Sequence, residues 1–331
     1  MKLVLWLLLT ALSARAQALR IYAIDTEGGK ATLYVTPTGE SMLIDTGYDG
    51  NDSRDANRIA AAAAAAGVKR INHVVITHFH SDHMGGLPQL LKKLPVDHIY
   101  DHGESVEGGK SATAAFLAYT DARSTLKHTV LRAGDTVPIK GLRVEVVSAD
   151  GKAITKALAA GGQPNPLCTS YQAMAADPGE NAHSLALMIT FGKLRISDLG
   201  DLYWNQEFDL ACPANKLGTV DLYMTTHHGT KTSGLPQIVH ALHPRVVLMN
   251  NGATKGGSVE AMTTIRKSPG LVDMWQLHYS NAGGATQNSS EQFLANPTEA
   301  CKGEWLEVTG LTDGTLTLKN SRNGFSKTYT R

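Results

Sequence analysis

The segment THFHSDHMGG, residues 77–86, places three histidines and one aspartate within six positions, directly after an apolar stretch. Zinc is bound by histidine nitrogens at about 2.0–2.1 Å and by carboxylate oxygens at about 2.0–2.2 Å, so its ligands must converge. In a tight loop, His78 and His80 can point to one metal while Asp82 and His83 point to a second. The segment therefore predicts a metal site where a buried strand ends.

The chain around this segment alternates between strand-like and helix-like stretches, which is typical of an α/β protein. Strands are predicted for Leu19–Asp25, Thr32–Thr36, Ser41–Asp45, Ile71–Thr77, Val96–Tyr100, Ser184–Thr190, Lys193–Asp198, Arg245–Asn250, Trp305–Thr309 and Thr315–Lys319. The alanine-rich run Asp52–Ala66 predicts a helix that stops at Gly67, and Pro88 predicts the first turn of another. Gly151–Pro178 is rich in Gly, Ala, Pro and Ser and predicts a long surface excursion.

A stretch of the first half recurs in the second half. Val74–Leu91 and Leu222–Val239 align without gaps, and six of the 18 positions are identical, including the shared Gly-Leu-Pro-Gln. Both stretches predict a strand, a histidine-bearing loop and a helix that starts at proline. We expect two related halves that pack sheet against sheet, with both histidine loops at the same edge. Chance similarity between two strand–turn–helix units is the alternative.

These motifs together resemble the metallo-β-lactamase superfamily, whose signature is HxHxDH. More specifically, the chain is similar to the hydrolase domain of the ComEC-type competence family, without its membrane channel. Five segments carry that resemblance in the expected order, and they are Asp25–Ala31, Ile44–Gly47, Asn181–Leu185, Leu199–Leu202 and His227–Thr230. The resemblance implies an α/β fold, namely a four-layer αββα sandwich of two related halves with a one- or two-zinc site at the sheet edge.

The resemblance also implies a set of metal ligands, which are His78, His80, Asp82, His83, His183, Asp201 and His227. Asp201 stands where the superfamily has a carboxylate shared by two metals. His183 completes the first zinc site unless Asn181 or water does so. His227 is taken for the second zinc, although the repeat aligns His228 with His80, so His227 and His228 are interchangeable. Asp82 and His228 are the catalytic candidates, with His228 as a proton donor or a substrate-binding group.

Three further residues are candidates for orienting ligands or contacting substrate, with a purely structural role as the alternative: Asp45, His102 and His278. Other catalytic motifs do not fit. Gly28-Gly29-Lys30 lacks the spacing of a phosphate-binding loop. The chain also contains no G-x-S-x-G segment, which argues against a serine hydrolase of that type.

The N-terminus has the pattern of an export signal. Lys2 supplies a positive charge, residues 3–12 form an apolar run, and residues 13–16 end in a small-x-small cleavage pattern. Ten residues rise about 15 Å as a helix and cannot cross a hydrocarbon layer of roughly 30 Å, so a membrane anchor is the weaker interpretation. We predict a signal peptide at residues 1–16, with cleavage after Ala18 as the alternative. The product is expected in the periplasm or outside the cell.

The composition fits a folded globular protein, with 331 residues, 42% hydrophobic residues and 18% charged residues. The net charge of +1 gives no electrostatic case for a nucleic-acid partner, and no segment after the signal suits a membrane. We predict residues 17–331 as a single metallo-β-lactamase-like hydrolase domain, with the oligomeric state open. In an oxidising compartment Cys168 and Cys212, or another pair of the three cysteines, can form a disulfide; unpaired buried thiols are the alternative.

The expected activity is that of an exported dizinc metallo-hydrolase that uses a hydroxide bridging two metals. A phosphodiester substrate is favoured because the resemblance runs to the ComEC-type family. The alternatives are a β-lactam or lactone (acyl) hydrolase and, less favoured, a non-catalytic binding module that keeps the scaffold. Zn²⁺ is the expected cofactor, with two ions per chain, and iron or manganese also suits histidine and aspartate ligands.

Overall fold

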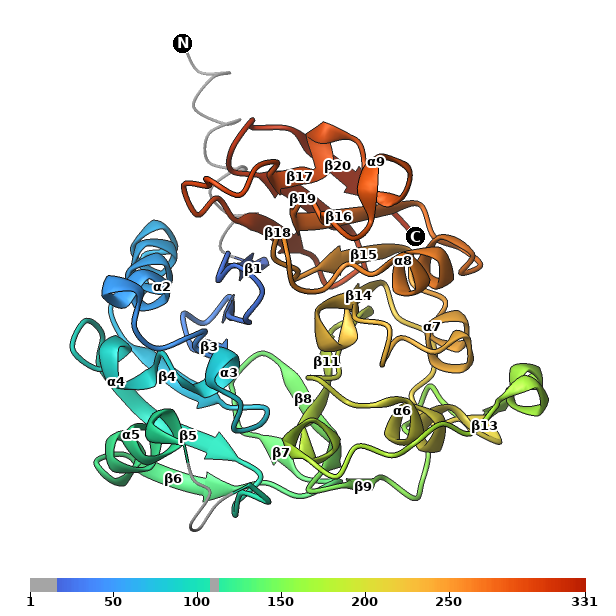
Figure 1. The fold of residues 1–331 in the computed structure, drawn as a ribbon, viewed down its shortest axis with the longest axis horizontal. Coiled ribbons are helices and arrows are strands. Elements are labelled where there is room, and N and C mark those ends of the chain that lie inside the picture. Colours follow the sequence, from blue (N-terminus) through green and yellow to red (C-terminus); the bar gives the residue numbers. More distant parts are fainter. Residues whose placement is uncertain (1–16, 108–112) are drawn as a thin grey trace.

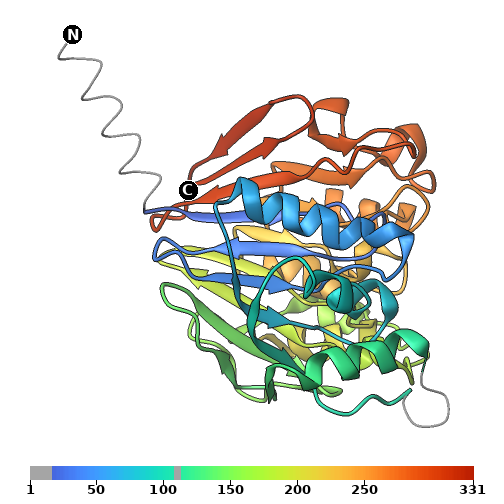
Figure 2. The same ribbon diagram turned by 90° about the vertical axis from the view of Figure 1, so that its left-hand side faces the viewer.

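Two large sheets lie face to face in this protein, and helices cover both outer faces (Figure 1, Figure 2). The computed structural model describes residues 17–107 and 113–331, so the predicted signal peptide lies outside the described residues. The order of layers is helix, sheet, sheet, helix. This arrangement confirms the predicted α/β class and the four-layer αββα sandwich.

The first sheet has the strand order β20-β19-β18-β1-β2-β3-β4-β5-β6. Its strands are β1 (Leu19–Ala23), β2 (Thr32–Val35), β3 (Ser41–Ile44), β4 (Ile71–Val75), β5 (Val96–Asp101), β6 (Lys127–Val130), β18 (Leu306–Gly310), β19 (Leu316–Asn320) and β20 (Ser326–Tyr329). Neighbours from β20 to β3 pair antiparallel, and β3 to β6 pair parallel. The change of direction follows from the connections, because β2 and β3 are joined by a tight turn with Gly39 at φ 85°, whereas helices separate the parallel strands.

The second sheet has the order β17-β16-β15-β14-β12-β11-β8-β7, with β9 paired to β8. Its strands are β7 (Thr136–Val137), β8 (Arg143–Ala149), β9 (Lys152–Ala153), β11 (Ala186–Phe191), β12 (Leu194–Asp198), β14 (Leu222–Met224), β15 (Val246–Met249), β16 (Asp273–His278) and β17 (Leu294–Asn296). The predicted strands Ser184–Thr190 and Lys193–Asp198 are present as β11 and β12, which pair antiparallel as a hairpin. From β12 to β17 all pairs are parallel, so their carboxyl ends meet at one edge.

The α-helices are α2 (Arg54–Ala65), α3 (Ser81–Met84), α4 (Leu87–Leu90), α5 (Ala114–Ser124), α6 (Trp204–Ala211), α7 (Pro236–Leu242), α8 (Val259–Arg266) and α9 (Gly284–Gln287). Short 3₁₀ turns are η1 (Asn51–Ser53), η3 (Pro166–Ser170), η4 (Glu180–His183), η5 (Thr226–Gly229) and η6 (Glu291–Phe293). The alanine-rich helix is confirmed, although it begins at Arg54 because Asp52 and Ser53 adopt positive φ. Within residues 17–107 and 113–331, no helix is both long and apolar enough to cross a membrane.

Three apolar layers hold the sandwich together. One lies between the sheets and joins Tyr34 and Met42 of the first sheet to Leu187 and Ile189 of the second. The other two lie between each sheet and its helices. Neighbouring residues on a strand point to opposite faces, so Leu43 packs under the helices while Met42 faces the other sheet. Strands covered on both faces need apolar residues at nearly every position, which explains the continuous apolar stretches.

The repeated sequence unit corresponds to a repeated structural unit. In the first half β4 leads through a histidine loop to α4 and then to β5, its parallel neighbour. In the second half β14 leads through η5 to α7 and then to β15, again a parallel neighbour. The two histidine loops meet, since His83 Nε2 and His228 Nε2 are 3.2 Å apart. The prediction that both loops share one edge is therefore confirmed.

The predicted surface excursion contains β9, β10 (Gln163–Pro164) and η3, and β10 pairs with β13 (Ala214–Asn215). Cys168 on η3 forms a disulfide with Cys212, which follows α6, across a sequence separation of 44 residues. This resolves the alternatives left open for the cysteines. Cys301 is the free thiol of the described chain.

Candidate metal centre

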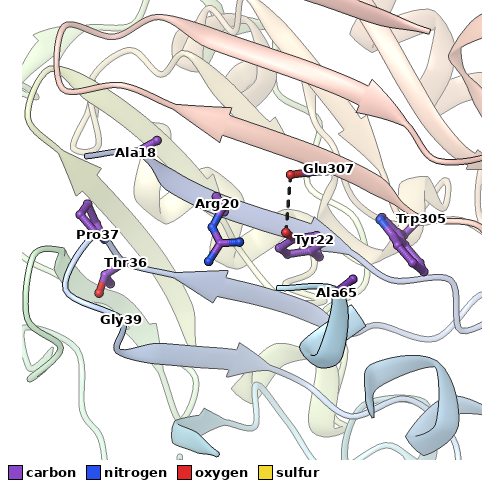
Figure 3. Close-up of a pocket in the computed structure, with 9 residues that line it drawn as sticks. All are labelled: Ala18, Arg20, Tyr22, Thr36, Pro37, Gly39, Ala65, Trp305 and Glu307. Carbon is purple, nitrogen blue, oxygen red and sulfur yellow. Dashed lines mark hydrogen bonds between the residues drawn. The ribbon is translucent and has the colours of Figure 1, made fainter. Parts of the chain in front are cut away.

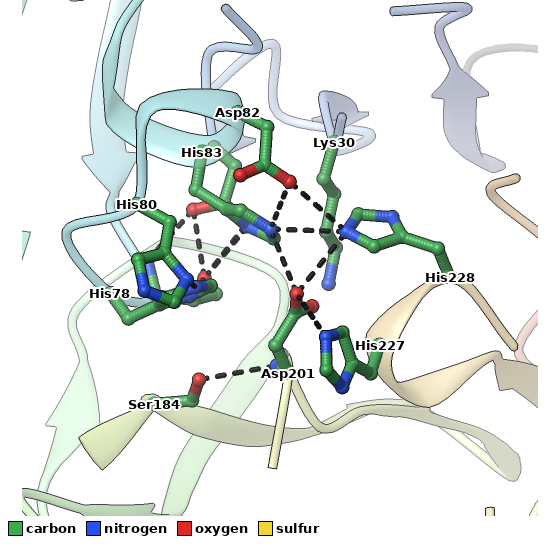
Figure 4. Close-up of polar contacts among 12 residues, drawn as sticks. Lys30, His78, His80, Asp82, His83, Ser184, Asp201, His227 and His228 are labelled. Carbon is green, nitrogen blue, oxygen red and sulfur yellow. Dashed lines mark hydrogen bonds and ion pairs between the residues drawn. The ribbon is translucent and has the colours of Figure 1, made fainter. Parts of the chain in front are cut away.

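The candidate centre lies at the edge where β4, β12 and β14 end (Figure 4). His78 follows β4, and the short helix α3 then carries Asp82 and His83. Asp201 follows β12 after Gly200, and His228 stands in η5 directly after β14. Gly200 adopts φ 57°, and a Cβ there would lie 2.9 Å from the Cβ of Ser184, so glycine is required for the close approach.

Four buried side chains form the tightest part of the centre, and they are Asp82, His83, Asp201 and His228. Their ligand-type atoms all lie within 4.8 Å of one another. Asp201 Oδ2 lies 3.1 Å from His83 Nε2 and 3.2 Å from His228 Nε2. Asp82 Oδ2 lies 3.2 Å from His83 Nε2 and 3.3 Å from His228 Nε2. Two imidazole nitrogens and two carboxylates thus converge on one small volume.

The donor set fits a divalent cation. His83 Nδ1 lies 2.8 Å from Asp45 Oδ2, and because a carboxylate only accepts, Nδ1 carries the proton. The other nitrogen, Nε2, therefore presents a lone pair to Asp82 and Asp201 unless the ring is charged. Oδ1 of Asp201 is also buried and has no hydrogen-bond partner among the described residues. Acceptors that face one another in a buried site require a proton or a metal ion between them.

His78 and His80 form a second pair beside this cluster. His78 Nε2 and His80 Nδ1 are 3.0 Å apart, and the His78 ring centroid lies 4.1 Å from that of His83. His78 is fully buried, whereas 32% of the His80 side chain is exposed and its Nε2 lies 3.4 Å from Glu107. The structure thus places the two predicted ligands of the first metal next to those of the second.

The remaining predicted ligands lie at the margin. His227 Nε2 is 3.7 Å from Asp201 Oδ2, so His228 is the nearer of the adjacent histidines. His183 Nδ1 lies 3.1 Å from Asp150, and within residues 17–107 and 113–331 its side chain makes no hydrogen bond to the cluster. The side-chain oxygen of Asn181 is buried without a partner in the same part of the chain. His183 and Asn181 are therefore the two candidates to complete the site of the first metal.

His227 is held in one tautomer by its neighbours. Its Nδ1 lies 3.1 Å from Ser233 Oγ, and the Ser233 hydroxyl donates its only proton to the carbonyl of Leu202 at 2.7 Å. The Ser233 contact is a hydrogen bond when Nδ1–H donates to it, which leaves an acceptor at Nε2; Thr232 Oγ1, 3.2 Å from Nδ1, is a second hydroxyl beside the same nitrogen. That acceptor faces Asp201, itself an acceptor. His227 is thus oriented to share a cation with Asp201 or to accept a proton there.

Pairing between the carboxylates and the imidazoles dominates the electrostatics of the cluster. Burial alone would raise the pKa of Asp201, but the imidazoles of His228 and His83 hold it well below its ordinary value. Burial lowers the pKa of His83, yet Asp201, Asp82 and Asp45 raise it well above its usual range. Burial lowers the pKa of His227 to about 4, so that ring is neutral at pH 7. The protein therefore holds ionised carboxylates against imidazoles at this edge.

Of the other candidates, Asp45 takes part directly. Besides His83, its carboxylate accepts hydrogen bonds from the backbone and the hydroxyl of Thr77, at 2.7 and 2.9 Å. It therefore orients the His83 ring. His102 pairs with Glu180 at 2.9 Å, and His278 pairs with Asp25 at 2.6 Å, so neither contacts the cluster through these nitrogens.

Two lysines at the centre were not foreseen from the sequence. Lys30 is buried and its Nζ pairs with Asp198, the last residue of β12. Lys255 reaches Asp82 Oδ2 with its Nζ, which also lies 3.3 Å from the hydroxyl of Tyr48. The sequence contains one indication of a buried lysine, because Lys30 stands between two glycines and a strand that is expected to be buried. Lys255 gave none, because it lies 173 residues from Asp82 in sequence.

A cavity of about 270 Å³ adjoins the centre. It is lined by Phe79, His80, Ser81, Asp82, Ser105, Glu107, Thr113, Ala115 and Phe116. Phe79 and Phe116 supply an apolar wall, with ring centroids 5.1 Å apart, next to the polar edge of Asp82. A mixed wall of this kind suits a small substrate with an apolar part.

Another cavity, of about 400 Å³, lies over β1 and β2 and is drawn in Figure 3. It is lined by Ala18, Arg20, Tyr22, Thr36, Pro37, Gly39, Ala65, Trp305 and Glu307. None of the candidate ligands faces it, and its chemistry is that of ordinary surface side chains. We assign the functional centre to the histidine edge because titratable groups converge there.

Comparison with known proteins agrees with this geometry. Residues 25–157 match the family model described as the metallo-beta-lactamase superfamily. Residues 25–157 thus resemble this superfamily, and the αββα sandwich of the described chain agrees with that resemblance. The matched region includes His78 to His83, while Asp201, His227 and His228 lie beyond it. Relatives named as a thioesterase and a hydrolase also match parts of the chain.

Two curated relatives illustrate the similarity. The chain is 38% identical over 93 residues to the atrochrysone carboxyl ACP thioesterase dmxR1 of Cryptosporiopsis, covering 26% of this chain and 28% of that protein. It is 32% identical over 78 residues to a hydroxyacylglutathione hydrolase of Xylella fastidiosa, covering 24% of each. The chain thus spans about a quarter of the length of these relatives.

A solved structure with a similar arrangement is the metallo-beta-lactamase fold protein YhfI from Bacillus subtilis. It has a TM-score of 0.48 and 12% sequence identity, and the match covers 78% of this chain and 96% of that one. The finer resemblance to ComEC-type hydrolases stays a prediction.

Proposed function

We propose that this protein is an exported dizinc metallo-hydrolase. The observation that carries the proposal is the convergence of His83 Nε2 and His228 Nε2 on Asp201 Oδ2, at 3.1 and 3.2 Å. His78 and His80 would hold one zinc ion together with His183 or Asn181. Asp82, His83 and His228 would hold the other, with Asp201 able to serve both. Zinc, when bound, supplies Lewis-acid polarisation and lowers the pKa of water to about 7.

The chain's own residues prepare the site for hydrolysis. Asp45 keeps the proton of His83 on Nδ1 and directs Nε2 inward. His227, neutral and unprotonated at Nε2, can accept a proton next to Asp201 or complete the second metal site. His228 lies nearer to Asp201 than His227 does, so we assign His228 as the metal ligand. His227 then takes the role of proton carrier that the sequence had suggested for His228. Phe79 and Phe116 line the cavity beside Asp82 and give it an apolar wall.

A phosphodiester is the first candidate substrate. Lys255 places an ammonium group at Asp82 and remains 35% exposed, so it can contact an anion that enters the site. The charge on a phosphodiester would then be met by Lys255 and by the metals together. The motif resemblance to ComEC-type hydrolases supports the same class.

An acyl substrate is the second candidate, and the activities for which the relatives are named favour it. The matched proteins include a thioesterase and a hydroxyacylglutathione hydrolase. A thioester, lactone or β-lactam carbonyl would use the same polarising groups, since only the shape of the cavity separates these substrates.

Export is the part of the proposal that depends on the N-terminal pattern at residues 1–16. The Cys168–Cys212 disulfide supports it, because such bonds persist mainly in oxidising compartments. N-terminal sequencing of the protein recovered from the periplasm or medium is expected to begin at Gln17 or, by the alternative, at Leu19. Recovery of the full-length chain in the cytoplasm alone would contradict export.

The test of the activity combines elemental analysis with kinetics on the purified mature chain. We expect at least two zinc ions per chain and turnover of bis-p-nitrophenyl phosphate that exceeds turnover of nitrocefin and of an acyl thioester. His83→Ala should abolish turnover and lower the metal content, whereas His98→Ala, on the far part of β5, should change neither. The opposite order of substrates would select the acyl candidate. A folded chain that keeps its activity after complete chelation would overturn the metallo-hydrolase.

A further inference from the structure

A second group of metal-ligand side chains lies away from the centre described above and shares no residue with it. It consists of Asp25, directly beyond β1, His278, the last residue of β16, and Cys301, in the loop before β18. One ligand-type atom from each lies within 4.8 Å of the others. Three donors from segments this far apart in sequence are brought together only by the fold.

The contacts inside this group are close. His278 Nε2 lies 2.6 Å from Asp25 Oδ1, and Cys301 Sγ lies 3.2 Å from Asp25 Oδ2. Glu27 Oε1 is 3.5 Å from the same sulfur and adds a fourth donor. Asp25 and His278 are fully buried, with 0% and 1% exposed. Ligands of a tetrahedral zinc ion stand roughly 3.3–3.6 Å apart, as follows from the usual zinc–nitrogen and zinc–sulfur distances, so the group needs little rearrangement.

The charges around the group leave room for a cation. Arg58 pairs with Asp25 and Glu27, at 2.9 Å each, and Arg54 pairs with Glu27 and Asp55, at 2.6 Å each. Three carboxylates therefore face two guanidinium groups. Burial and Asp25 raise the pKa of Cys301 to about 11, so the free thiol is neutral. A divalent ion that binds the thiolate would bring the local charge to zero.

A small cavity adjoins the group at His278 and Glu27. This cavity of about 180 Å³ is lined by Glu27, Ala253, Thr254, His278 and Glu299. Its volume holds several water molecules, since each takes about 30 Å³ in the liquid. Glu27 and Glu299 place two carboxylates on the wall of the cavity, together with His278. The cavity is therefore suited to admit a hydrated cation.

We propose that Asp25, His278 and Cys301 form a structural zinc site, with Glu27 or water as the fourth ligand. On binding, the Cys301 thiol releases its proton to solvent and a zinc–sulfur bond forms, with no change of oxidation state. The Asp25–His278 hydrogen bond opens to admit the ion, and the proton that Nε2 donates in this bond moves through solvent to Nδ1, which has no hydrogen-bond partner among the described residues. This leaves the Nε2 lone pair for the zinc. Because Asp25 follows a strand of the first sheet and His278 ends a strand of the second, the ion cross-links the two sheets. Sulfur, nitrogen and oxygen donors together select a borderline-soft ion such as Zn²⁺.

Absorption spectroscopy of the Co²⁺-loaded protein can detect this site separately, because it has a sulfur ligand. The candidate metal centre contains no sulfur ligand, and Cys168 and Cys212 are joined in a disulfide. Cys301 is thus the thiol of the described chain that can give a thiolate-to-Co²⁺ charge-transfer band in the near ultraviolet. The full chain, purified without thiol reductant and loaded with Co²⁺, is expected to show this band. Cys301→Ser should lose the band and about one metal ion per chain, while His83→Ala should keep the band.

The two variants separate this proposal from the proposed function. Loss of the hydrolase activity and of part of the bound metal in His83→Ala, with the sulfur band intact, would show two independent sites. Circular dichroism of Cys301→Ser provides the check that the fold is retained, and Ser is a conservative change at this partly exposed position. Absence of the sulfur band from the parent chain, its persistence in Cys301→Ser, or an unchanged metal count in a folded Cys301→Ser would each overturn the structural zinc site.

Discussion

His83 Nδ1 lies 2.8 Å from Asp45 Oδ2, and both side chains are fully buried. The carboxylate comes from the end of β3 and the imidazole from α3, so the contact joins two loops at the same sheet edge. Asp45 adopts φ 61°, a conformation that nonglycine residues rarely occupy, and its carboxylate also holds Thr77. The strained turn is thus tied to the orientation of one ligand.

Asp45→Asn is expected to weaken metal binding at the centre. The amide removes the negative charge that fixes the proton of His83 on Nδ1, and partners of this kind contribute about 10–100-fold to metal affinity or activity. Zinc affinity, measured by competition with a chromogenic chelator, should fall within that range. Asp97→Asn, at an exposed residue that pairs with Arg70, is the matched control. Equal affinities in the two variants would contradict an orienting role for Asp45.

Lys255→Gln is expected to discriminate against anionic substrates. Removing the ammonium group near Asp82 should raise KM for bis-p-nitrophenyl phosphate by about 10-fold, which corresponds to about 1.4 kcal/mol. KM for the neutral ester p-nitrophenyl acetate should change little, because this substrate carries no charge that Lys255 could contact. Lys319→Gln, an exposed residue of β19, serves as the control. An equal rise of KM for both substrates would show that Lys255 positions Asp82 and does not bind the substrate.

Much of the fold follows from local sequence patterns. The predicted strand Val96–Tyr100 corresponds to β5, Val96–Asp101, and Thr315–Lys319 corresponds to β19, Leu316–Asn320. These agree because apolar runs between turns specify strands that are covered on both faces. The histidine loop was equally readable, since its ligands lie within six residues.

The rest of the site depends on relationships that sequence patterns do not contain. His227 and His228 both adopt positive φ, at 51° and 55°, so no regular periodicity predicts which ring turns toward Asp201. Lys255 reaches Asp82 only through the packing of the two halves. The disulfide partner of Cys168 was likewise one alternative among several, because three cysteines do not specify a pairing.

Lys30→Met is expected to destabilise the protein strongly. Lys30 and Asp198 are 1% and 0% exposed, so the change leaves a buried carboxylate without its cation. Breaking such a pair costs about 3–5 kcal/mol, whereas replacing both partners costs less. Urea unfolding should show that loss for Lys30→Met and a partial recovery when Asp198→Asn is added. Lys93→Met, at an exposed position, should be close to the parent. If Lys30→Met were as stable as Lys93→Met, the ion pair between Lys30 and Asp198 would not stabilise the fold.

Glu207 is expected to make stability fall as pH rises. Burial raises its pKa to about 7, against hydrogen bonds from the backbones of Leu235 and Gly234 that lower it. Between the ordinary value of 4.5 and about 7, the unfolded carboxyl is ionised while the native one stays protonated. The native state then binds more protons, so its free energy of unfolding decreases by about 1.4 kcal/mol per pH unit. The contribution is constant below that window and above it.

Glu207→Gln removes this titration and should therefore flatten the pH profile. Because the amide offers a single oxygen to two backbone donors, the variant should be less stable than the parent at pH 4.5. That deficit should shrink by about 3 kcal/mol by pH 7.5, since only the parent loses stability in between. Urea unfolding at several pH values measures the difference, with Glu291→Gln, 76% exposed, as the control. If the free energy of unfolding changed with pH in the same way in the parent and in Glu207→Gln, Glu207 would be ionised throughout this range. The hydrogen bonds from the backbones of Gly234 and Leu235 would then offset the cost of its burial.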